Sequence, residues 1–315
     1  MLDMRDISRR TALRATTAAI VGSGLLGAVP VASADQHDPP AAENVTVSDE
    51  NLEYIEEDPD AGFHYPYFLY TPPSLAGCDD SPTPIFVKPN NSPGPEDEFD
   101  YHLEVAKASA EARRPRKIAE RLAIPLLVPV FPRYRESPVR WYVYTKVLDP
   151  DTFMMADSPQ ERVDEQLLKM VEHAKSRLED DGHTIADKIH IDGFSESGTF
   201  ANRFTILHPE RVNAASHGGT AVKTLPKTEL DEDVPVVGDP NWDQMSYPLG
   251  TEEEELPYPI GVANLEALTG RSFNRKAWFD TPQYMYIGGE DRPEPGSSGH
   301  RSFSNLPPED VQRVP

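Results

Sequence analysis

The stretch from Lys188 to Pro209 constrains the fold of this chain more than any other. A short β-branched run ends at Asp192, a tight turn with Ser195 at its tip follows, and helical spacing then continues to Pro209. A serine on a sharp strand-to-helix turn presents its hydroxyl, and the N–H of the next residue, Glu196, can face a developing oxyanion. The order of strand, turn and helix therefore predicts an α/β fold with a chemically available serine. The alternative is a Gly/Ser-rich turn without chemistry.

Other apolar runs around this turn extend the pattern. Strands are expected at 64–70, 84–88, 124–131 and 283–287 and from residue 212, the first of them antiparallel at a sheet edge. Helices are expected at 101–122, interrupted at Pro115, and from Ser158, where a capping box precedes an apolar stripe that stops near Gly182. This alternation predicts a mostly parallel sheet with helices on both faces.

The turn resembles the nucleophile elbow of α/β-hydrolases, whose pattern is Gly-x-Ser-x-Gly. Gly193 and Ser195 take the first and third places, Ser197 stands in the fifth, and the glycine follows one residue later at Gly198. A small serine can replace glycine where the helix packs close to the sheet. The resemblance covers about residues 50–291 and is greatest to secreted esterases and polyhydroxyalkanoate depolymerase-like proteins. It implies the α/β-hydrolase fold.

The resemblance also implies catalytic roles. Ser195 would be the nucleophile, and the oxyanion would be held by the Glu196 N–H and by a backbone N–H near Asn91, in the loop after the third strand of the fold. Asp291, just beyond the last strand, would be the acid of the triad, with Glu290 or a plain turn as competitors. Asp291 would orient a histidine that takes and returns the proton.

The position of that histidine departs from the family pattern. His300 is the only histidine after Asp291, and residues 292–315 show no strand pattern. Either His300 is the base, or the last strand and helix of the fold are lacking at the C-terminus, or an upstream histidine such as His217 or His102 serves instead. His217 is also a candidate substrate-binding residue, because it follows a strand at the carboxyl edge of the sheet.

The charge of the chain excludes some functions. The formal net charge is −23, and lysines are fewer than arginines. Such a surface argues against nucleic-acid binding and fits a halophilic protein. The single cysteine, Cys78, allows no intrachain disulfide. The acids and histidines lack metal-ligand spacing, and no glycine-rich phosphate loop is present, so we expect no metal and no cofactor.

The N-terminus reads as a targeting segment. Ser8 to Arg14 resembles a twin-arginine export motif, with Ala12 where phenylalanine is usual, before an apolar run and a small-residue cleavage site at Ala32–Ala34. We predict a signal peptide at 1–34, a flexible leader at 35–50, a hydrolase domain at 51–291 and an irregular tail at 292–315. Residues 222–270 would form a lid-like excursion. An uncleaved membrane anchor is the alternative for the signal.

Three functions remain open from the sequence. The first is an exported serine hydrolase, extracellular or at the cell surface, that acts on a small or polymeric ester and has the twin-arginine export machinery as a partner. The second is a serine peptidase on the same fold. The third is a truncated, non-catalytic protein with the hydrolase fold. The oligomeric state is not fixed by the sequence.

Overall fold

The computed structural model describes residues 49–77, 81–92, 94–135, 148–155, 158–220, 224–229 and 255–286. The predictions for the signal peptide at 1–34, the leader up to residue 48, Cys78 and the tail at 292–315 lie outside the described residues. So do the predicted roles of Glu290, Asp291 and His300, and the expectation that the last strand and helix are lacking.

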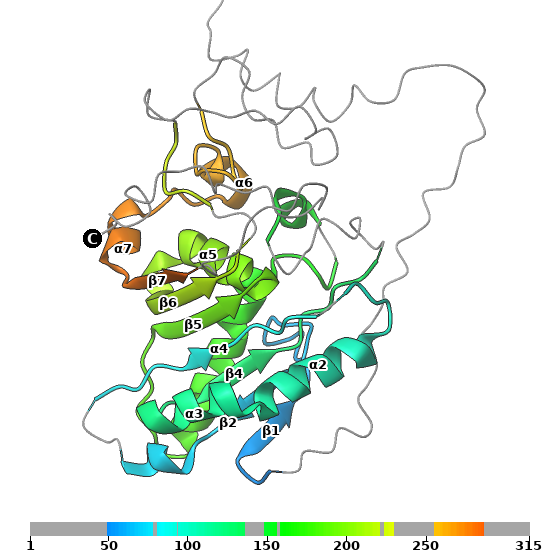
Figure 1. Ribbon diagram of the computed structural model, residues 1–315, viewed down its shortest axis with the longest axis vertical. Coiled ribbons are helices and arrows are strands. Elements are labelled where there is room, and N and C mark those ends of the chain that lie inside the picture. The colour runs from blue at the N-terminus through cyan, green and yellow to red at the C-terminus, as the bar shows by residue number, and fades with distance from the viewer. Residues whose placement is uncertain are drawn as a thin grey trace, which may run out of the picture. The chain divides into compact units, whose positions relative to one another are not determined.

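A mostly parallel sheet organises the described residues. It holds seven strands in the order β1-β2-β4-β3-β5-β6-β7 (Figure 1). β2 is antiparallel to β1 and to β4, and every other neighbouring pair is parallel. The strands are β1 Leu52–Ile55, β2 Tyr67–Tyr70, β3 Phe86–Val87, β4 Leu126–Pro129, β5 Ile189–Phe194, β6 Val212–Gly218 and β7 Gln283–Tyr286. The predicted mostly parallel sheet is confirmed.

One strand lies elsewhere than predicted. The segment that contains β2 was expected at the edge of the sheet, but β2 lies between β1 and β4. The short run Leu52–Ile55 pairs with it and takes the edge position instead. Pro72 and Pro73, which suggested an edge, come after the strand has ended and remove no hydrogen bond from it.

Helices connect most of the strands. They are α2 Phe99–Glu111, α3 Arg113–Leu122, α4 Val163–Asp180, α5 Glu196–Leu207, α6 Leu265–Thr269 and α7 Arg275–Asp280, with 3₁₀ turns at Pro73–Gly77, Pro150–Met154 and Pro209–Arg211. The predicted interruption separates α2 from α3 at Ala112, and Pro115 lies in the first turn of α3, where it breaks no helical hydrogen bond. None of the helices described has both the length and the apolar character needed to cross a membrane.

The start of α4 corrects a prediction. The capping box at Ser158 predicted that the helix begins there, but α4 begins at Val163. Residues from Ser158 form a separate turn, in which the Ser158 carbonyl accepts from Glu161 N at 2.9 Å. Arg162 then takes a left-handed conformation with φ 46°, which interrupts any helix. The predicted apolar stripe is confirmed, since its five residues are all buried: Val163, Leu167, Val171, Ala174 and Leu178.

The contacts of β2 show that helices cover both faces of the sheet. Tyr70 lies under the guanidinium of Arg116 from α3, 4.6 Å from its ring centroid. Tyr67 hydrogen-bonds through its hydroxyl with Nδ1 of His173 from α4 at 2.8 Å. Successive side chains of a strand point to opposite faces, so residues 67 and 70 face opposite sides. The predicted helices on both faces are therefore confirmed.

The strand register shows which residues of the other strands lie on the same face as Tyr70. Tyr70 pairs with Leu126, Leu126 with Phe86, and Phe86 with His190, so these residues share the α3 face. Gly193 lies on the opposite face, against α5. On the α3 face, the side chains of β5 to β7 are half-buried or exposed; the most exposed are Tyr284 at 67 % and Phe194 at 49 %. We call this part the open face: His190, Asp192, Phe194, Ala214, Ser216, Tyr284 and Tyr286.

Residues 222–270, expected to form an excursion, lie between β6 and α7 and contain α6. Its two described ends run side by side, because Leu256 N donates to Thr228 O at 2.7 Å and Leu225 N donates to Ile260 O at 2.8 Å. Thr224 N also donates to the Asn202 side chain of α5 at 2.8 Å. The excursion is thus anchored to the helix that follows Ser195, while 230–254 lies outside the described residues and the lid-like role stays a prediction.

Candidate active site

Ser195 is the single residue between the end of β5 and the start of α5, and it forms the turn that the sequence predicted. Its backbone has φ 58° and ψ −120°, a region that non-glycine residues occupy only when the surrounding structure enforces it. Two hydrogen bonds hold it: Ser195 N donates to Gly218 O at 2.9 Å, and Thr199 N donates to Ser195 O at 3.0 Å. The residue is exposed. A strained, exposed serine at a helix N-terminus is the geometry that the elbow requires.

Two glycines make the close approach of α5 to the sheet possible. A Cβ atom on Gly193 would lie 2.0 Å from the Ser197 carbonyl oxygen, so no side chain fits there. A Cβ atom on Gly198 would lie 2.6 Å from the carbonyl oxygen of Gly218 in β6. The glycine that comes one place late in the motif therefore still provides the tight helix–strand contact.

The serine in the fifth place of the motif closes the turn. Ser197 is buried, and its Oγ accepts a hydrogen bond from Phe194 N and donates to Phe194 O, both at 3.0 Å. Glycine could make neither bond. The departure of this chain from Gly-x-Ser-x-Gly thus adds a side-chain brace beneath Ser195.

The two predicted oxyanion donors lie beside the elbow. Glu196 is the first residue of α5, and an N–H at this position has no acceptor in the preceding turn and favours negative charge. Its carboxylate pairs with Arg133 Nε at 3.4 Å, which ties the start of α5 to the loop after β4. Asn91 donates from Nδ2 to Phe194 O at 3.2 Å, so the loop after β3 contacts the elbow directly. Their roles as oxyanion donors stay predictions.

The neighbouring residue Asn90 fixes this loop. Its buried side chain donates from Nδ2 to Phe131 O at 2.9 Å and accepts at Oδ1 from Phe131 N at 3.1 Å. The loops after β3 and β4 are therefore joined by a two-bond clamp. A small hollow lies between these loops and the start of α5, lined by Pro89, Asn90, Phe131, Glu196, Ser197 and Phe200.

The two upstream histidines are both buried. His217 was expected in a loop after its strand, but β6 continues to Gly218 and the imidazole is 0 % exposed. Its Nε2 lies 3.3 Å from Oε1 of Gln283 in the neighbouring strand β7. The strand predicted from residue 212 is confirmed, but it continues to Gly218 and so includes His217. The binding role of His217 stays a prediction.

His102 is engaged in a separate buried network. Its Nδ1 hydrogen-bonds with Ser92 Oγ at 2.9 Å, and its Nε2 lies 2.8 Å from Glu96 O. The ring is fully buried within the α2 region. Among the residues that the structure describes, no histidine hydrogen-bonds with Ser195.

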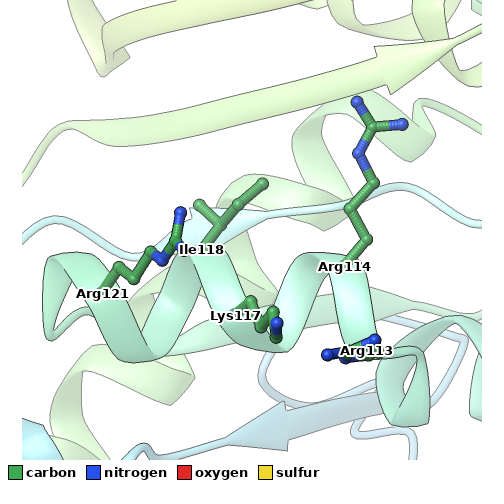
Figure 2. Close-up of a pocket in the computed structure, with 5 residues that line it drawn as sticks. All are labelled: Arg113, Arg114, Lys117, Ile118 and Arg121. Carbon is green, nitrogen blue, oxygen red and sulfur yellow. The ribbon is translucent and has the colours of Figure 1, made fainter.

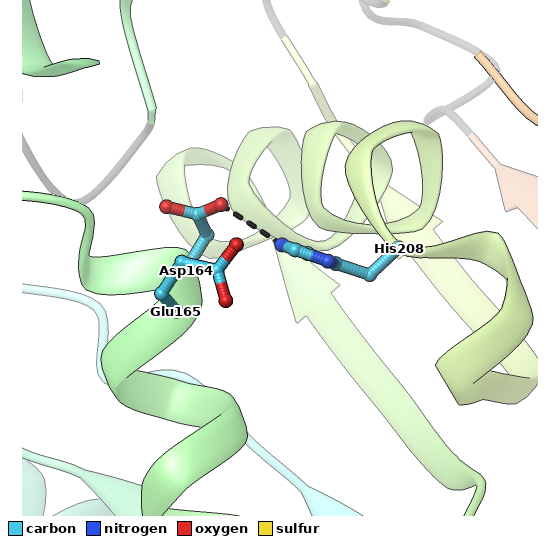
Figure 3. A group of neighbouring side chains, drawn as sticks. All are labelled: Asp164, Glu165 and His208. Carbon is cyan, nitrogen blue, oxygen red and sulfur yellow. Dashed lines mark hydrogen bonds and ion pairs between the residues drawn. The ribbon is translucent and has the colours of Figure 1, made fainter. Parts of the chain in front are cut away.

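A second cluster was missed by sequence reasoning. Asp164, Glu165 and His208 lie together (Figure 3). Arg162 donates to Asp164 at 2.7 Å and to Glu165 at 2.9 Å, and Asp164 also bonds with His208 Nε2 at 2.8 Å. Arg271 Nη1 lies 3.2 Å from the other nitrogen of His208. These guanidinium groups supply the positive charge that a metal ion would bring.

The electrostatics of Asp164 follow from these contacts. Burial opposes its ionisation, but the hydrogen bonds from Arg162 and His208 outweigh burial and lower its pKa to about 2. The cluster links the start of α4 to the end of α5 and is an internal ion-pair network. No sequence signal could have found it, because Asp164 and His208 are 44 positions apart.

Comparisons with known proteins give resemblances of fold. No family model matches the chain, and no curated protein matches it. Among solved structures, a poly(aspartic acid) hydrolase-1 from Sphingomonas sp. KT-1 is 17 % identical, with 84 % of this chain and 80 % of that chain covered and a TM-score of 0.46. A poly(3-hydroxybutyrate) depolymerase from Bordetella parapertussis is 16 % identical, with 78 % and 67 % covered and a TM-score of 0.40.

An acetyl xylan esterase from Aspergillus awamori is 15 % identical, with 53 % of this chain covered and a TM-score of 0.36. The chain spans half the length of that esterase. A sheet with an antiparallel β2, parallel strands from β4 onward and a strained serine after β5 agrees with the α/β-hydrolase fold predicted from the sequence.

Proposed function

We propose that this chain is an exported serine hydrolase that cleaves carboxylic esters with Ser195 as its nucleophile. The observation that carries the proposal is the exposed Ser195, held at φ 58° between β5 and the N-terminus of α5. Backbone strain of this kind persists at functional sites because the surrounding packing pays for it. The names of the structural neighbours, an acetyl xylan esterase and a poly(3-hydroxybutyrate) depolymerase among them, support an ester as the substrate.

The proposed reaction proceeds in two halves. Ser195 Oγ attacks the ester carbonyl, and the tetrahedral oxyanion accepts hydrogen bonds from the Glu196 N–H and from an N–H near Asn91. Collapse releases the alcohol and leaves an acyl–serine ester, which water then hydrolyses. Each oxyanion donor contributes about 3 kcal/mol in comparable sites. His300 and Asp291, both outside the described residues, are the proposed base and its orienting acid.

Labelling with a fluorophosphonate tests the nucleophile. The folded chain, kept in high salt, should form one covalent adduct that maps to Ser195. Ser195→Ala should remove the adduct and reduce turnover of short acyl esters by at least about a thousandfold. Ser272→Ala, a change on the loop before α7, is the matched control and should keep both signals. An adduct that persists in Ser195→Ala would contradict the proposal.

A second candidate is a non-catalytic protein with the hydrolase fold. Within the described ranges no histidine hydrogen-bonds with Ser195, and a serine without a base is a poor nucleophile at neutral pH. The same labelling experiment separates the two candidates. If Ser195 is labelled, His300→Ala and His217→Ala identify the base; if a demonstrably folded chain is not labelled, the non-catalytic function is favoured.

Export is a separate part of the proposal. It is supported by the arginine pair Arg9 and Arg10 before an apolar run, and by the acidic composition, which suits a chain that folds in concentrated salt before transport. Replacing both arginines by lysine should retain the protein inside the cell, as measured by fractionation of a halophilic host. Undiminished appearance outside the cell would contradict the twin-arginine route.

A further inference from the structure

A basic surface stands out on α3 of this acidic chain. Arg113, Arg114, Lys117, Ile118 and Arg121 line an open hollow of about 390 Å³, which we call the basic cradle (Figure 2). Its four cationic side chains are exposed. Figure 2 shows Arg114, Ile118 and Arg121 directed to the same side of the helix, as expected for positions three and four apart.

The cations of the basic cradle lack acidic partners in the described part of the chain. Other arginines are paired there: Arg116 with Asp49, Arg133 with Glu196, and Arg203 with Asp149. No described acid forms an ion pair with Arg113, Arg114, Lys117 or Arg121, although the chain has 53 acidic residues and only 30 basic ones.

The spacing of the cations on α3 lowers the stability of this helix when no anion is bound. Arg113, Lys117 and Arg121 follow one another at intervals of four residues, and like charges at this spacing destabilise a helix by some tenths of a kcal/mol per pair. Glu120 of the same helix accepts from the Tyr70 hydroxyl at 3.3 Å and forms no ion pair with these described cations. A local concentration of positive charge in so acidic a protein points to an anionic ligand.

The basic cradle lies on the same side of the sheet as the open face. The side chain of Arg116 from α3 covers Tyr70, and the strand register places Phe194 and Tyr286 on that same face. Tyr286 in turn stacks on Phe194, with centroids 6.1 Å apart and planes at 23°. Phe194 directly precedes Ser195. The basic cradle and the Tyr286–Phe194 stack therefore lie on one face of the sheet, and the stack ends beside the nucleophile.

We propose that the basic cradle is an anchoring subsite for a substrate chain that carries several carboxylates, whose ester group reaches Ser195 across the Tyr286–Phe194 stack. This inference rests on the proposed ester hydrolysis at Ser195. Guanidinium groups bind carboxylates through two parallel hydrogen bonds, and Arg114 and Arg121 are separated by about 10 Å along the helix, which suits an extended ligand with repeated charges.

The chemistry of the surface favours an organic polyacid over a phosphate polymer. Ile118 in the floor of the basic cradle and the aromatic rings of the open face offer apolar contacts to a carbon chain. Away from this surface, a net charge of −23 repels a long polyanion such as nucleic acid. A short chain with carboxylates at intervals can bind the cations of the basic cradle without extending over the acidic surface of the rest of the protein.

A binding experiment tests the subsite independently of catalysis. A fluorescent poly-glutamate oligomer is titrated into Ser195→Ala, with and without the triple change Arg114→Gln, Lys117→Gln and Arg121→Gln. We expect the triple change to weaken binding at least tenfold and to reduce the salt dependence of binding. The matched control neutralises two cations of α7, Arg275→Gln and Lys276→Gln, and should bind as the parent does.

Two results would overturn the proposal: equal binding by the parent and the triple variant, or binding of inorganic polyphosphate that depends on the three cations when poly-glutamate binding does not. Unfolding curves establish that the triple variant is folded. Because the three side chains are exposed and their like charges repel, the triple variant should be as stable as the parent or slightly more stable.

An activity experiment links the subsite to the reaction. Two esters with the same acyl group are compared, one neutral and one extended by several carboxylates. The triple variant should raise KM for the acidic ester about tenfold with kcat unchanged, and leave the neutral ester unaffected. Equal effects on both esters would contradict a carboxylate subsite. If the neutral ester is not hydrolysed by the parent, the proposed function fails, and the binding result alone decides whether the basic cradle binds polyacids.

Discussion

The two faces of the sheet from β5 to β7 differ in how they are covered. On one face, α5 lies so close to β5 and β6 that backbone meets backbone at Gly193 and Gly198. On the other, Tyr286 lies over Gly218, where a Cβ would be 2.2 Å from the ring, and Tyr284 and Phe194 are largely exposed. The covered face is fixed by main-chain atoms, whereas the open face is lined by side chains that can rotate.

This difference separates stability from recognition. Ser195 lies between β5 and α5. The close packing of α5 on the covered face holds its backbone conformation, and Phe194 beside it belongs to the open face. We expect substitutions on the covered face to act on folding and those on the open face to act on ligands. Three predictions follow in order of decreasing effect; the first and the last test that division, and the second tests a buried cluster that joins α4 to the end of α5.

The largest effect should come from the aromatic residues of the two faces. Phe204 of α5 is 0 % exposed and stacks on Phe200, whereas Tyr284 is 67 % exposed. Phe204→Ala should lower the free energy of unfolding by about 3 to 5 kcal/mol, because it leaves a cavity in the core. Tyr284→Ala should change it by less than about 0.5 kcal/mol. Chemical denaturation measures both, and similar losses at the two sites would break the comparison.

The next effect concerns the ion-pair cluster that links α4 to the end of α5. Asp164→Asn should cost about 3 kcal/mol near neutral pH, because Arg162 then loses its buried partner. The Asp164 carboxyl has a folded pKa of about 2 against an ordinary value of 3.8, so its contribution is complete above about pH 4 and is lost as the pH falls toward 2.

Unfolding measured from pH 6 to pH 2 checks this dependence. The cost of Asp164→Asn should be constant down to about pH 4 and then shrink. Asp187→Asn is the control, since this exposed carboxylate pairs with Lys175 at the surface and should matter little at any of these pH values. A constant cost of Asp164→Asn at all pH values would show that the charge of Asp164 contributes nothing to folding.

The smallest effect compares glycines. Gly193→Ala should destabilise the chain by about 2 to 3 kcal/mol, because the new methyl group meets the fixed Ser197 carbonyl. Gly218→Ala should cost less than about 1 kcal/mol, because the Tyr286 ring on the open face can swing away. Gly94→Ala, where the space is empty, is the control. A larger loss at Gly218 than at Gly193 would mean that the open face is as rigid as the covered one.

Much of the fold could be predicted because local patterns determine it. The apolar run before Ser195, the helical spacing after it and the stripe on α4 each depend on neighbours in sequence, and all three are confirmed. The predicted start of α4 was wrong because the capping signal at Ser158 is satisfied equally by an isolated turn. The predicted edge position of β2 was wrong because β1 pairs with its outer side. No local pattern in a four-residue strand indicates which strand it will pair with.

The site was predictable only where its residues share one stretch of chain. Ser195, Glu196 and the glycines of the elbow follow from a single motif. The brace made by Ser197 and the contact of Asn91 with Phe194 depend on how α5 and the loop after β3 meet, which no spacing encodes. The burial of His217 and the Asp164–His208 pair depend on packing between elements distant in sequence. The predicted roles of Asp291 and His300 stay predictions.

The pair of hydrogen bonds between Asn90 and Phe131 affects how quickly a substrate can bind. Because the loops after β3 and β4 share two buried hydrogen bonds, neither loop can shift by itself, and Asn91 is already placed beside the elbow before any substrate arrives. A site of this kind binds without waiting for a loop to fold over its ligand, so association should follow diffusion and charge more than conformational rearrangement. The amide hydrogen of Phe131 should accordingly exchange with solvent as slowly as those of the central strands.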